Sequence, residues 1–546
     1  MTKKILICTA WPYGSGIPHL GNITGSLLPG DVFTRYYKLK GHDAVHVSGT
    51  DAHGTKIEFE AFAQKTTPKE LSDRIHAKIV ELLDKFEIRF ENYTTTESPT
   101  HKRFVTEIYK QIEANRYILA IEEDRAFCEV DKKFLADSFI VGTCPRCGFA
   151  HAQGNQCDQC GSLLEPEQLV KPTCQICKQS QIVFKRTKNW FLDLAKLEPK
   201  LKAYHASHPE WADNVKNFTH GLLKEGLKPR AVTRDIQWGI AAPFAGAAGK
   251  VIYVWAEAAL GYVSATIEYF EKLGQPERWK EFWFGDNVKQ VYVQGKDNIP
   301  FHTVIFPGQL VSSEQGYHLP DQVAASEYLN WIGKHKFSKS RKIGIFWDDA
   351  LELLNDPTYW RFYLLYLRPE KRDIEFSWED FDKAVNGVLI DNIGNLVNRV
   401  VALAGRKYDG IYPQAIVNSE IFKRIERVKS EYERSIDAGY LAPALRAATD
   451  LAVMGNEYVQ NNKPWEGNKP EVILTGLQLI KAIIILLEPF VPAFSHKAYG
   501  MLNLEKPTFE DILKVETGKA LGAAQVLLPK VDITVLKEKY SQMKTA

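Results

Sequence analysis

The first fifty residues alternate a buried strand, a turn, a helix and a second strand. An apolar run at residues 5–7 leads into a turn rich in glycine and proline, a helical segment spans about residues 21–41, and residues 43–48 form the next apolar run. Strand, helix and strand at this spacing indicate a βαβ unit of a parallel sheet. The chain should therefore fold around an α/β sheet whose ligands bind at the carboxyl ends of the strands.

This pattern is interrupted and then resumes. Residues 116–232 carry three Cys-x-x-Cys pairs and many turn residues, after which strand signals return at residues 251–255 and 288–295. Beyond Ser377, a candidate helix cap, strand signals fade and apolar residues recur at helical spacing; they are Val385, Leu389, Ile393, Leu396, Val397 and Val400. We expect a Rossmann-like domain in two halves (1–115 and 233–330), a zinc-knuckle insertion (116–232), a loop and contact region (331–380) and an α-helical bundle (381–546).

Composition narrows the class of protein only partly. The 546 residues include 69 basic and 67 acidic side chains, and a formal charge of +2 still permits a basic face for nucleic acid. The first apolar run ends too early for a signal peptide, and the longest, residues 480–487, includes Lys481 and is too short to cross a bilayer. Six of the eight cysteines form pairs, which favours metal in a reducing compartment over disulfides. We expect a soluble, cytoplasmic protein.

The turn after the first strand carries a candidate phosphate site. Residues 9–22 end in His19-Leu20-Gly21-Asn22, where the next helix begins. The free N–H groups of a helix start favour an anion, and a histidine beside them can hydrogen-bond phosphates as charge builds. The alternative is an ordinary loop histidine with a glycine that packs helix on strand. The four residues alone leave both open.

A basic run follows the second α/β half. Lys336-Phe337-Ser338-Lys339-Ser340, taken alone, indicates a solvated loop or a nucleic-acid patch. Together, however, the two motifs resemble the His-x-Gly-His and Lys-x-Ser-Lys-Ser signatures of class I aminoacyl-tRNA synthetases, in the right order and in opposite halves of an interrupted sheet. Asn22 departs from the second histidine, since it can donate a hydrogen bond but cannot be charged.

This resemblance implies an ATP site in which Mg²⁺ accompanies the nucleotide. The implied catalytic residues are His19, Asn22, Lys336 and Lys339, and the implied ATP-binding residues are these four with Gly21, Gly295 and Asp297. The lysines would neutralise the triphosphate, and the role of His19 would be electrostatic.

The segments around Tyr13 and Asp51-Ala52-His53-Gly54-Thr55 resemble methionyl-tRNA synthetases, and the match runs along most of the chain. An aspartate at a strand's carboxyl end can hold an α-ammonium group, and an aromatic wall suits a thioether. The implied methionine-binding residues are Trp11, Tyr13, Asp51, Arg234, Trp255, Ala258, Tyr262, Phe301 and His302. Taken singly, each of these aromatic residues would more often pack in a hydrophobic core than bind a substrate. Glu257 and Ala259 depart from the aspartate and proline of many members.

The cysteine pairs predict metal sites. Two pairs with the spacing CxxC-x9-CxxC form a closed, structural tetrahedral zinc site of Cys144, Cys147, Cys157 and Cys160. The third pair has no cysteine pair downstream. Two-zinc members of the family have an interleaved second site, which here would consist of Cys128, Asp131, Cys174 and Cys177. An empty knuckle or a redox pair remains the alternative.

The helical third supplies a candidate RNA face. Asn395 and Arg399 lie four residues apart on one helical face, and Pro464-Trp465 follows farther on. Single-stranded RNA is read by stacking and by hydrogen bonds to base edges. The resemblance implies that these four residues meet the CAU anticodon of tRNA(Met). A helix-capping proline and a packed tryptophan are the alternative.

The expected activity is methionine–tRNA ligation: ATP and L-methionine give methionyl-adenylate, which is transferred to tRNA(Met) with release of AMP and pyrophosphate. We expect a monomer, with or without a separate tRNA-binding subunit in trans, and no membrane partner. Three alternatives remain open: a synthetase for an aliphatic amino acid, which would carry a larger editing insertion; a catalytically decayed, zinc-containing RNA-binding protein; and a small-molecule nucleotidyltransferase, which would not need the helical domain.

Overall fold

The computed structural model describes residues 2–135, 139–154, 157, 160, 162, 164, 166–335, 337 and 343–545. Its centre is a five-stranded parallel sheet in the order β14-β13-β1-β2-β3. The strands are β1 (Lys4–Thr9), β2 (Asp43–Thr50), β3 (Asn92–Thr95), β13 (Val288–Gly295) and β14 (Gln322–Ser326). The chain runs from β1 toward β3 on one side and returns much later to β13 and β14 on the other. The strand order therefore reverses between β1 and β13, where open α/β sheets bind ligands.

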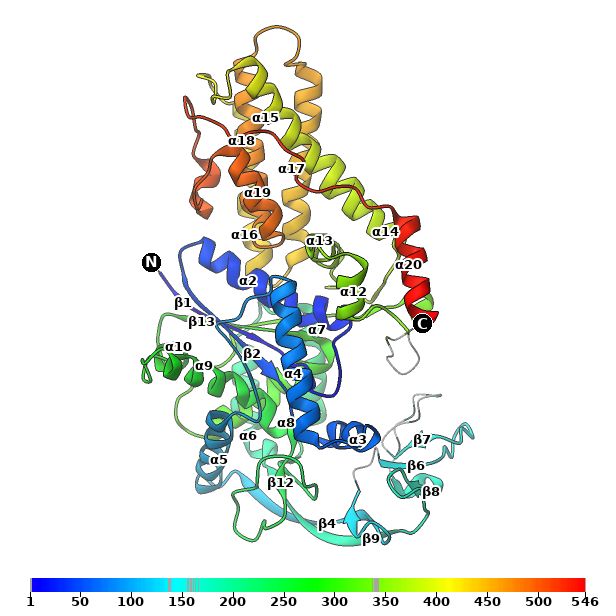
Figure 1. Ribbon diagram of the computed structural model, residues 1–546. Helices are drawn as coiled ribbons and strands as arrows, with labels where there is room; N and C mark the ends of the chain where they lie inside the picture. The colour runs from blue at the N-terminus through cyan, green and yellow to red at the C-terminus, as the bar shows by residue number, and fades with distance from the viewer. Residues whose placement is uncertain are drawn as a thin grey trace.

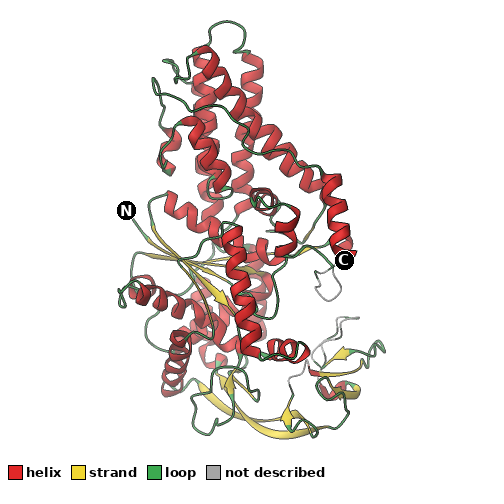
Figure 2. Ribbon diagram, viewed as in Figure 1, coloured by secondary structure: helices red, strands yellow, loops and turns green. Residues whose placement is uncertain are grey.

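Helices cover both faces of this sheet (Figure 1, Figure 2). Successive residues of a strand face opposite sides, so Ile5 and Ile7 enter one core while Leu6 and Cys8 enter the other. The first core includes α2 (Leu28–Leu39) and α4 (Pro68–Lys85). The second includes α5 (Pro99–Ala114), α9 (Gly261–Lys272), α10 (Lys280–Trp283) and α11 (Phe306–Ser312). The predicted parallel α/β sheet is confirmed.

The predicted first helix is confirmed, with one wide turn inside it. It consists of α1 (Leu20–Asn22), the π-helical η1 (Ile23–Leu27) and α2. Such turns occur frequently at functional sites. A second π turn, η6 (Phe301–Ile305), lies on the opposite half of the domain just before α11.

The expected strand at residues 251–255 is wrong. Only β12 (Val251–Ile252) is extended, and it pairs antiparallel with β11 (Thr233–Arg234) outside the main sheet. The chain then turns at Tyr253 into α8 (Val254–Glu257) and the short helix η4 (Ala258–Leu260). A short apolar run does not distinguish a buried strand from the start of a buried helix, which explains the error.

The insertion is a long antiparallel ribbon with a small sheet at its far end (Figure 1). Strands β4 (Ile118–Cys128) and β9 (Ile182–Leu192) pair along their whole length and are flanked by β5 (Lys133–Phe134) and β10 (Arg230–Ala231). The distal sheet contains β6 (Ile140–Thr143), β7 (Ala152–Gln153) and β8 (Val170–Cys174), with η3 (Pro166–Gln168) before β8. The helices α6 (Leu194–Ala206) and α7 (Asp213–Glu225) lead back toward the main domain.

The C-terminal third is a helical bundle, as predicted. Ser377 Oγ accepts a hydrogen bond of 3.0 Å from the N–H of Asp380 and so caps α14 (Trp378–Asp382). This helix continues without a break through η8 (Lys383–Gly394) into α15 (Asn395–Lys407). All six apolar residues singled out from the sequence are fully buried. The remaining helices are α16 (Ser419–Asp437), α17 (Leu441–Asn462), α18 (Pro470–Leu487), α19 (Pro492–Leu502), η9 (Phe509–Leu513) and α20 (Ile533–Thr545).

Helix α18 is the one described helix long and apolar enough to cross a membrane. Most of its apolar window, 89%, is buried inside the protein, where it packs against α15, α16, α17 and α19. It is the central helix of the bundle.

Smaller elements connect these parts. They are α3 (Thr55–Ala63), η5 (Lys296–Asn298), β15 (Leu329–Asn330), η7 (Ile332–Lys334), α12 (Trp347–Leu353), α13 (Thr358–Tyr366) and β16 (Ile374–Glu375). On α13, Arg361 is completely buried and joins the sheet domain to the bundle. Its guanidinium donates to Asp31 Oδ2 of α2 at 2.7 Å and to the carbonyl of Phe490, between α18 and α19, at 2.9 Å. The two parts therefore share a hydrogen-bonded core.

Candidate active site, metal centres and RNA face

His19 lies at the point where the strand order reverses, at the start of the helix after β1. Its backbone is extended, and its N–H donates to Asn22 Oδ1 at 3.1 Å. Burial lowers the pKa of the imidazole to about 4, with a smaller effect from Lys56. His19 is therefore neutral at physiological pH, and its Nδ1 is buried without a hydrogen-bond partner among the described residues. A neutral ring of this kind offers a hydrogen bond, not a charge.

The residues around His19 fix its ring. A Cβ at Gly21 would lie 3.0 Å from the imidazole and 3.3 Å from the Leu329 carbonyl oxygen, so a larger residue here would press on the His19 ring. Asn22 is exposed and its side chain holds the helix start through the bond to His19. This gives the asparagine a local role that needs no charge.

The lysine loop can be located only through Phe337. The ring of Phe337 stacks on His19 with centroids 4.4 Å apart and planes 5° apart. Lys336 and Lys339 lie outside the described residues. Phe337, the one residue of the second motif that the structure describes, therefore lies against the histidine of the first.

The end of β13 provides the other predicted nucleotide residues. Gly295 is its last residue, and the space that a Cβ would fill there is open. Asp297 follows in η5 and accepts a hydrogen bond from Tyr328 Oη. Both stand beside the β1 end that leads to His19, on the same edge of the sheet.

Several predicted methionine residues form one aromatic cluster. The rings of Trp255 and Phe301 stack at 4.4 Å, and Tyr13 meets Trp255 edge-on at 5.8 Å. His302 is buried and its Nε2 lies 2.8 Å from Tyr262 Oη, while its Nδ1 lies 2.9 Å from the Asn298 carbonyl oxygen. Since Nδ1 must donate to that carbonyl, Nε2 accepts from the tyrosine. Burial lowers the pKa of His302 to about 4, which keeps the ring neutral.

Three further predicted residues flank this cluster. Trp11 is wedged between two backbones, since a Cβ at either Gly49 or Gly261 would approach its ring to 2.4–2.5 Å. Arg234 stacks on the ring of Tyr253 at 4.4 Å, and Ala258 opens η4 directly after α8. The indole N–H of Trp11 is buried without a partner among the described residues.

Asp51 follows β2 directly and is 2% exposed. Its N–H donates to the Pro12 carbonyl at 2.9 Å and its carbonyl accepts from the Gly14 N–H at 2.7 Å, so it is fixed against the turn that carries Tyr13. Burial, together with the nearby Glu257 carboxylate, raises the pKa of Asp51 to about 8. A cation placed against this carboxylate would restore its ionised form.

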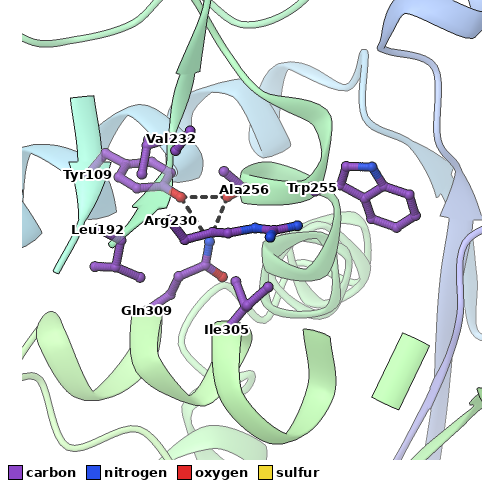
Figure 3. Close-up of a pocket in the computed structure, with 9 residues that line it drawn as sticks. Tyr109, Leu192, Arg230, Val232, Trp255, Ala256, Ile305 and Gln309 are labelled. Carbon is purple, nitrogen blue, oxygen red and sulfur yellow. Dashed lines mark hydrogen bonds between the residues drawn. The ribbon is translucent and has the colours of Figure 1, made fainter. Parts of the chain in front are cut away.

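Behind Trp255 lies a small cavity (Figure 3). Its volume of about 10 Å³ leaves room for roughly one water molecule. Tyr109 Oη and Gln309 Nε2 both donate to the Ala256 carbonyl, at 2.6 and 2.7 Å, and Trp255 points away from them. These buried bonds hold the first turn of α8 and so fix Trp255; the cavity is too small for an amino acid.

The first cysteine set converges at the distal sheet. The four sulfurs of Cys144, Cys147, Cys157 and Cys160 lie within 4.8 Å of one another. Cys144 and Cys160 are 3.9 Å apart, and Cys147 and Cys157 are 3.6 Å apart, so none of these pairs is a disulfide. Sulfurs around tetrahedral zinc lie ~3.8 Å apart. This donor set therefore fits zinc.

The second predicted set also converges, at the base of the distal sheet. Asp131 Oδ2 lies 3.2 Å from the Cys128 sulfur and 3.1 Å from that of Cys174, while Cys128 and Cys177 are 3.5 Å apart. In the first cysteine set, Gly148 follows Cys147 with a φ of +76°. In the second set, Lys178 follows Cys177 and adopts the same left-handed conformation, with a φ of +63°. Three thiolates and one carboxylate again form a four-donor shell.

The predicted RNA residues lie at one end of the bundle, where α15 and the loop after α17 meet. The guanidinium of Arg399 stacks on the ring of Trp465 at 4.7 Å and donates to Gln460 Oε1 at 2.8 Å. Trp465 is 37% exposed, and Asn395, one helical turn before Arg399, is exposed as well. Pro464, which precedes Trp465, is buried. It follows Lys463, which ends α17 in a left-handed conformation. Together they form a flat aromatic and cationic face, far from the sheet (Figure 1).

Two family models match this chain. One, described as tRNA synthetases class I (M), covers residues 5–401, and the other, the anticodon binding domain of methionyl tRNA ligase, covers residues 414–543. The chain belongs to the class I methionyl-tRNA synthetase family. Its Rossmann-like domain, split by the cysteine insertion and followed by the helical domain, is the architecture of that family.

Similar proteins support this membership over the full length. The methionine–tRNA ligase of Saccharolobus islandicus is 44% identical over 97% of this chain and 95% of its own. The methionine–tRNA ligase of Thermofilum pendens is 43% identical over 100% of this chain and 98% of its own. The crystal structure of Mycobacterium tuberculosis methionyl-tRNA synthetase bound by methionyl-adenylate has the same fold, with a TM-score of 0.79 at 19% identity over 97% of this chain and 100% of that one.

Sequence reasoning missed several residues of the site in this methionyl-tRNA synthetase family member. Phe337 was only a spacer between two lysines, and Gln309 and Tyr109 belong to no motif. His53 stands within the motif that begins at Asp51, but it was given no role. In the sequence alone, Glu257 stands out only as a departure from the aspartate of many family members. Its position against His53 depends on the fold, because residues 204 positions apart meet there.

Proposed function

We propose that this protein is a methionine–tRNA ligase that activates L-methionine with ATP and transfers it to tRNA(Met), with release of AMP and pyrophosphate. The supporting observation is that one sheet edge combines a neutral histidine at a helix start, a buried carboxylate and an aromatic cluster. His19, Asp51 and Trp255 represent these three parts. A separate RNA face on the bundle fits a tRNA substrate.

We propose that adenylate formation occurs by in-line attack of the methionine carboxylate on the α-phosphate of ATP. His19 contributes a hydrogen bond to a phosphate oxygen as charge develops, and its stack with Phe337 keeps the ring in place. Gly295 and Asp297 border the nucleotide, and Gly295 leaves room for the ribose beside the backbone. The lysines at 336 and 339 supply the positive charge that neutral His19 lacks, and Mg²⁺ accompanies ATP. Positioning and charge stabilisation provide the rate enhancement, without a protein nucleophile.

We propose that methionine binds with its ammonium group on Asp51 and its side chain in the aromatic cluster. Tyr13, Trp255 and Phe301 enclose a flexible thioether without a charged partner. Tyr262 donates its hydroxyl hydrogen to His302 Nε2, and His302 donates from Nδ1 to the Asn298 carbonyl. Neither side chain therefore has a free hydrogen-bond donor. Arg234 stacks on Tyr253, two residues before Trp255, and its charge suits the substrate carboxylate.

We propose that both cysteine sets hold structural zinc. Each set offers four donors, so no position is left for a substrate, and the ions would tie the distal sheet to the ribbon. The division into 1–115, 116–232, 233–330, 331–380 and 381–546 remains our proposal for the functional segments. We place the protein in the cytoplasm as a monomer, with a tRNA-binding subunit in trans as an optional partner.

Asn395, Arg399, Pro464 and Trp465 are proposed to bind the anticodon. The Arg399–Trp465 stack presents a flat, cationic surface on which a base can stack, and such stacking is worth about 1–3 kcal/mol per base.

The test is ATP–pyrophosphate exchange with each of the twenty amino acids, followed by aminoacylation of tRNA(Met). Exchange stimulated by methionine alone is the expected result. Exchange with leucine, isoleucine or valine but not methionine would refute the specificity. If tRNA binds but no amino acid stimulates exchange, the chain is an RNA-binding protein that has lost its chemistry.

A further inference from the structure

A buried ionic chain lies directly behind Asp51. His53 is 1% exposed at its side chain, and its Nδ1 lies 2.6 Å from Glu257 Oε1 while its Nε2 lies 2.7 Å from Glu97 Oε1. Glu257 is fully buried. A carboxylate can only accept, so two carboxylates at these distances need two N–H donors. The pKa values of Glu97 and Glu257 are lowered by their hydrogen bonds and by the charge of His53, so both are carboxylates and His53 between them is an imidazolium.

Other groups support this charge. Lys102 Nζ lies 2.7 Å from Glu97 Oε1, and the second oxygen of Glu257 lies 3.6 Å from His101 Nε2. Burial would lower the pKa of His53, but the charge and hydrogen bonds of Glu257 and Glu97 raise it well above its usual range. Burial would raise the pKa of Glu257, but His53 and His101 lower it.

The buried ionic chain of Glu97, His53 and Glu257 is connected to Asp51 by the backbone as well as by charge. The N–H of His53 donates to Asp51 Oδ1 at 3.3 Å. The residue between them is also held, since Ala52 donates its N–H to Thr96 Oγ1 at 2.9 Å and its carbonyl accepts from Trp238 Nε1 at 2.6 Å. The ring of Trp238 meets that of His53 edge-on at 5.5 Å. The three-residue segment that follows β2 is thus fixed from both sides.

We propose that His53 is a positioning residue for the α-ammonium group of the amino-acid substrate. Clamped between Glu257 and Glu97, it orients the Asp51 carboxylate through its backbone N–H and offsets the charge of Glu257, which would otherwise favour a protonated Asp51. This inference rests on the proposed function, because it assigns the ammonium group to Asp51. It also gives a role to the glutamate at position 257: its length reaches His53 from α8.

The groups that face Asp51 from each side decide its pH behaviour. Glu257 disfavours its ionised form and His53 favours it, while Tyr13 packs beside it from the turn after β1. Because a proton on Asp51 competes with the ammonium group, the KM for the amino acid should fall as the pH rises toward 8. Without the His53 charge, this fall should move to higher pH.

The experiment compares His53→Gln with the wild type in pyrophosphate exchange and in inhibition by two analogues. L-Methioninol keeps the ammonium group, and 4-(methylthio)butanoate lacks it. We expect the KM for methionine and the inhibition constant of methioninol to rise together, by about 10- to 100-fold, since a buried charged contact is lost. The KM for ATP and the inhibition constant of the butanoate should stay within about twofold of the wild type.

Glu97→Gln provides a milder variant in case the histidine substitution prevents folding, because its side chain lies at the edge of the network and is 11% exposed. For Glu97→Gln we expect the KM for methionine and the inhibition constant of methioninol to rise together, by less than in His53→Gln. His46→Gln is the matched control: His46 is fully buried on β2 and bonded through both ring nitrogens, to Thr9 Oγ1 and the Arg89 carbonyl oxygen, but neither partner is a carboxylate near Asp51. It should show no difference between the analogues.

Equal losses for both analogues in His53→Gln, or no loss for either, would overturn the positioning role. The proposed specificity can fail separately. If the wild type exchanges with another amino acid, the alcohol and desamino analogues of that amino acid test His53 in the same way. Absence of exchange with every amino acid would overturn both proposals.

Discussion

Replacing Asp51 with asparagine should stabilise the protein while removing its activity. The carboxylate is 2% exposed and its pKa is raised from 3.8 to about 8 by burial and by Glu257. The folded state therefore favours the protonated acid. Below pH 3.8 both states are protonated and no penalty exists; as the pH rises toward 8, the unfolded chain ionises freely while the folded chain does not.

The magnitude follows from this interval. A tenfold change in protonation equilibrium is worth about 1.4 kcal/mol. The difference between the pKa of 3.8 in the unfolded chain and about 8 in the folded chain therefore corresponds to about 5–6 kcal/mol of unfolding free energy at pH 8. His53 and Glu257 share the titration, so we expect about 2–3 kcal/mol for Asp51 itself. The Asp51→Asn substitution would keep the size of the side chain and the backbone bonds of this position, but the amide would not ionise.

The assay is the thermal midpoint of the full-length protein at pH 5, 6.5 and 8. Asp51→Asn should unfold about 2–3 °C above the wild type at pH 8, with a smaller difference at each lower pH. Methionine-dependent exchange should lose about 100-fold in kcat/KM, because the ammonium group loses a buried charged partner. A variant that is less stable at pH 8, or that differs equally at all three pH values, would refute the reasoning.

Asp31→Asn is the matched control with the opposite sign. Asp31 is equally buried, but although burial alone would raise its pKa, Arg35 and Arg361 lower it. Its ionised form therefore stabilises the fold at neutral pH, and this contribution is lost as the pH falls through the lowered pKa. Asp31→Asn should destabilise the protein at pH 7, and the difference should shrink in acid.

The remaining predictions concern four other sites. Trp465→Ala should lower aminoacylation by about 10-fold or more while exchange is unchanged; a parallel loss of both would exclude an anticodon role. Asp131→Ala should reduce the zinc content of the purified chain from two ions to one, measured by elemental analysis. Phe337→Ala should slow exchange by about 10-fold, because the His19 ring loses its stack. Arg361→Met should lower the free energy of unfolding by about 3–5 kcal/mol, since it leaves a buried carboxylate without its partner on α13.

The sequence predicted the local elements well where periodicity and turns agreed. The βαβ start, the cap at Ser377 and the buried stripe from Val385 to Val400 depend on neighbouring residues and are confirmed. The run at residues 251–255 was misread because burial, and not strand pairing, explains its apolar character. Local pattern cannot tell these two causes apart.

The site was harder to predict than the fold. Spacing was enough for Cys144 and its partners, since a knuckle is a local structure. The His53–Glu257 contact and the stack of Phe337 on His19 join distant segments, and their chemistry depends on burial that only the folded chain produces. The resemblance supplied the substrate residues, whereas the ionic chain behind Asp51 required the structure.

The central strand pairing has a consequence for biosynthesis. β1 pairs with β13, so Lys4 meets Val288, about 280 residues later in the chain. At translation rates of about 5–20 residues per second, β1 waits roughly 15–60 s with one edge unpaired. During that interval β1, β2 and β3 present an apolar, open edge on which strands of other chains can add. Nascent chains should therefore need a chaperone until β13 emerges, and mutations that slow ribosomes between the two strands should lower the yield of folded protein without changing its final stability.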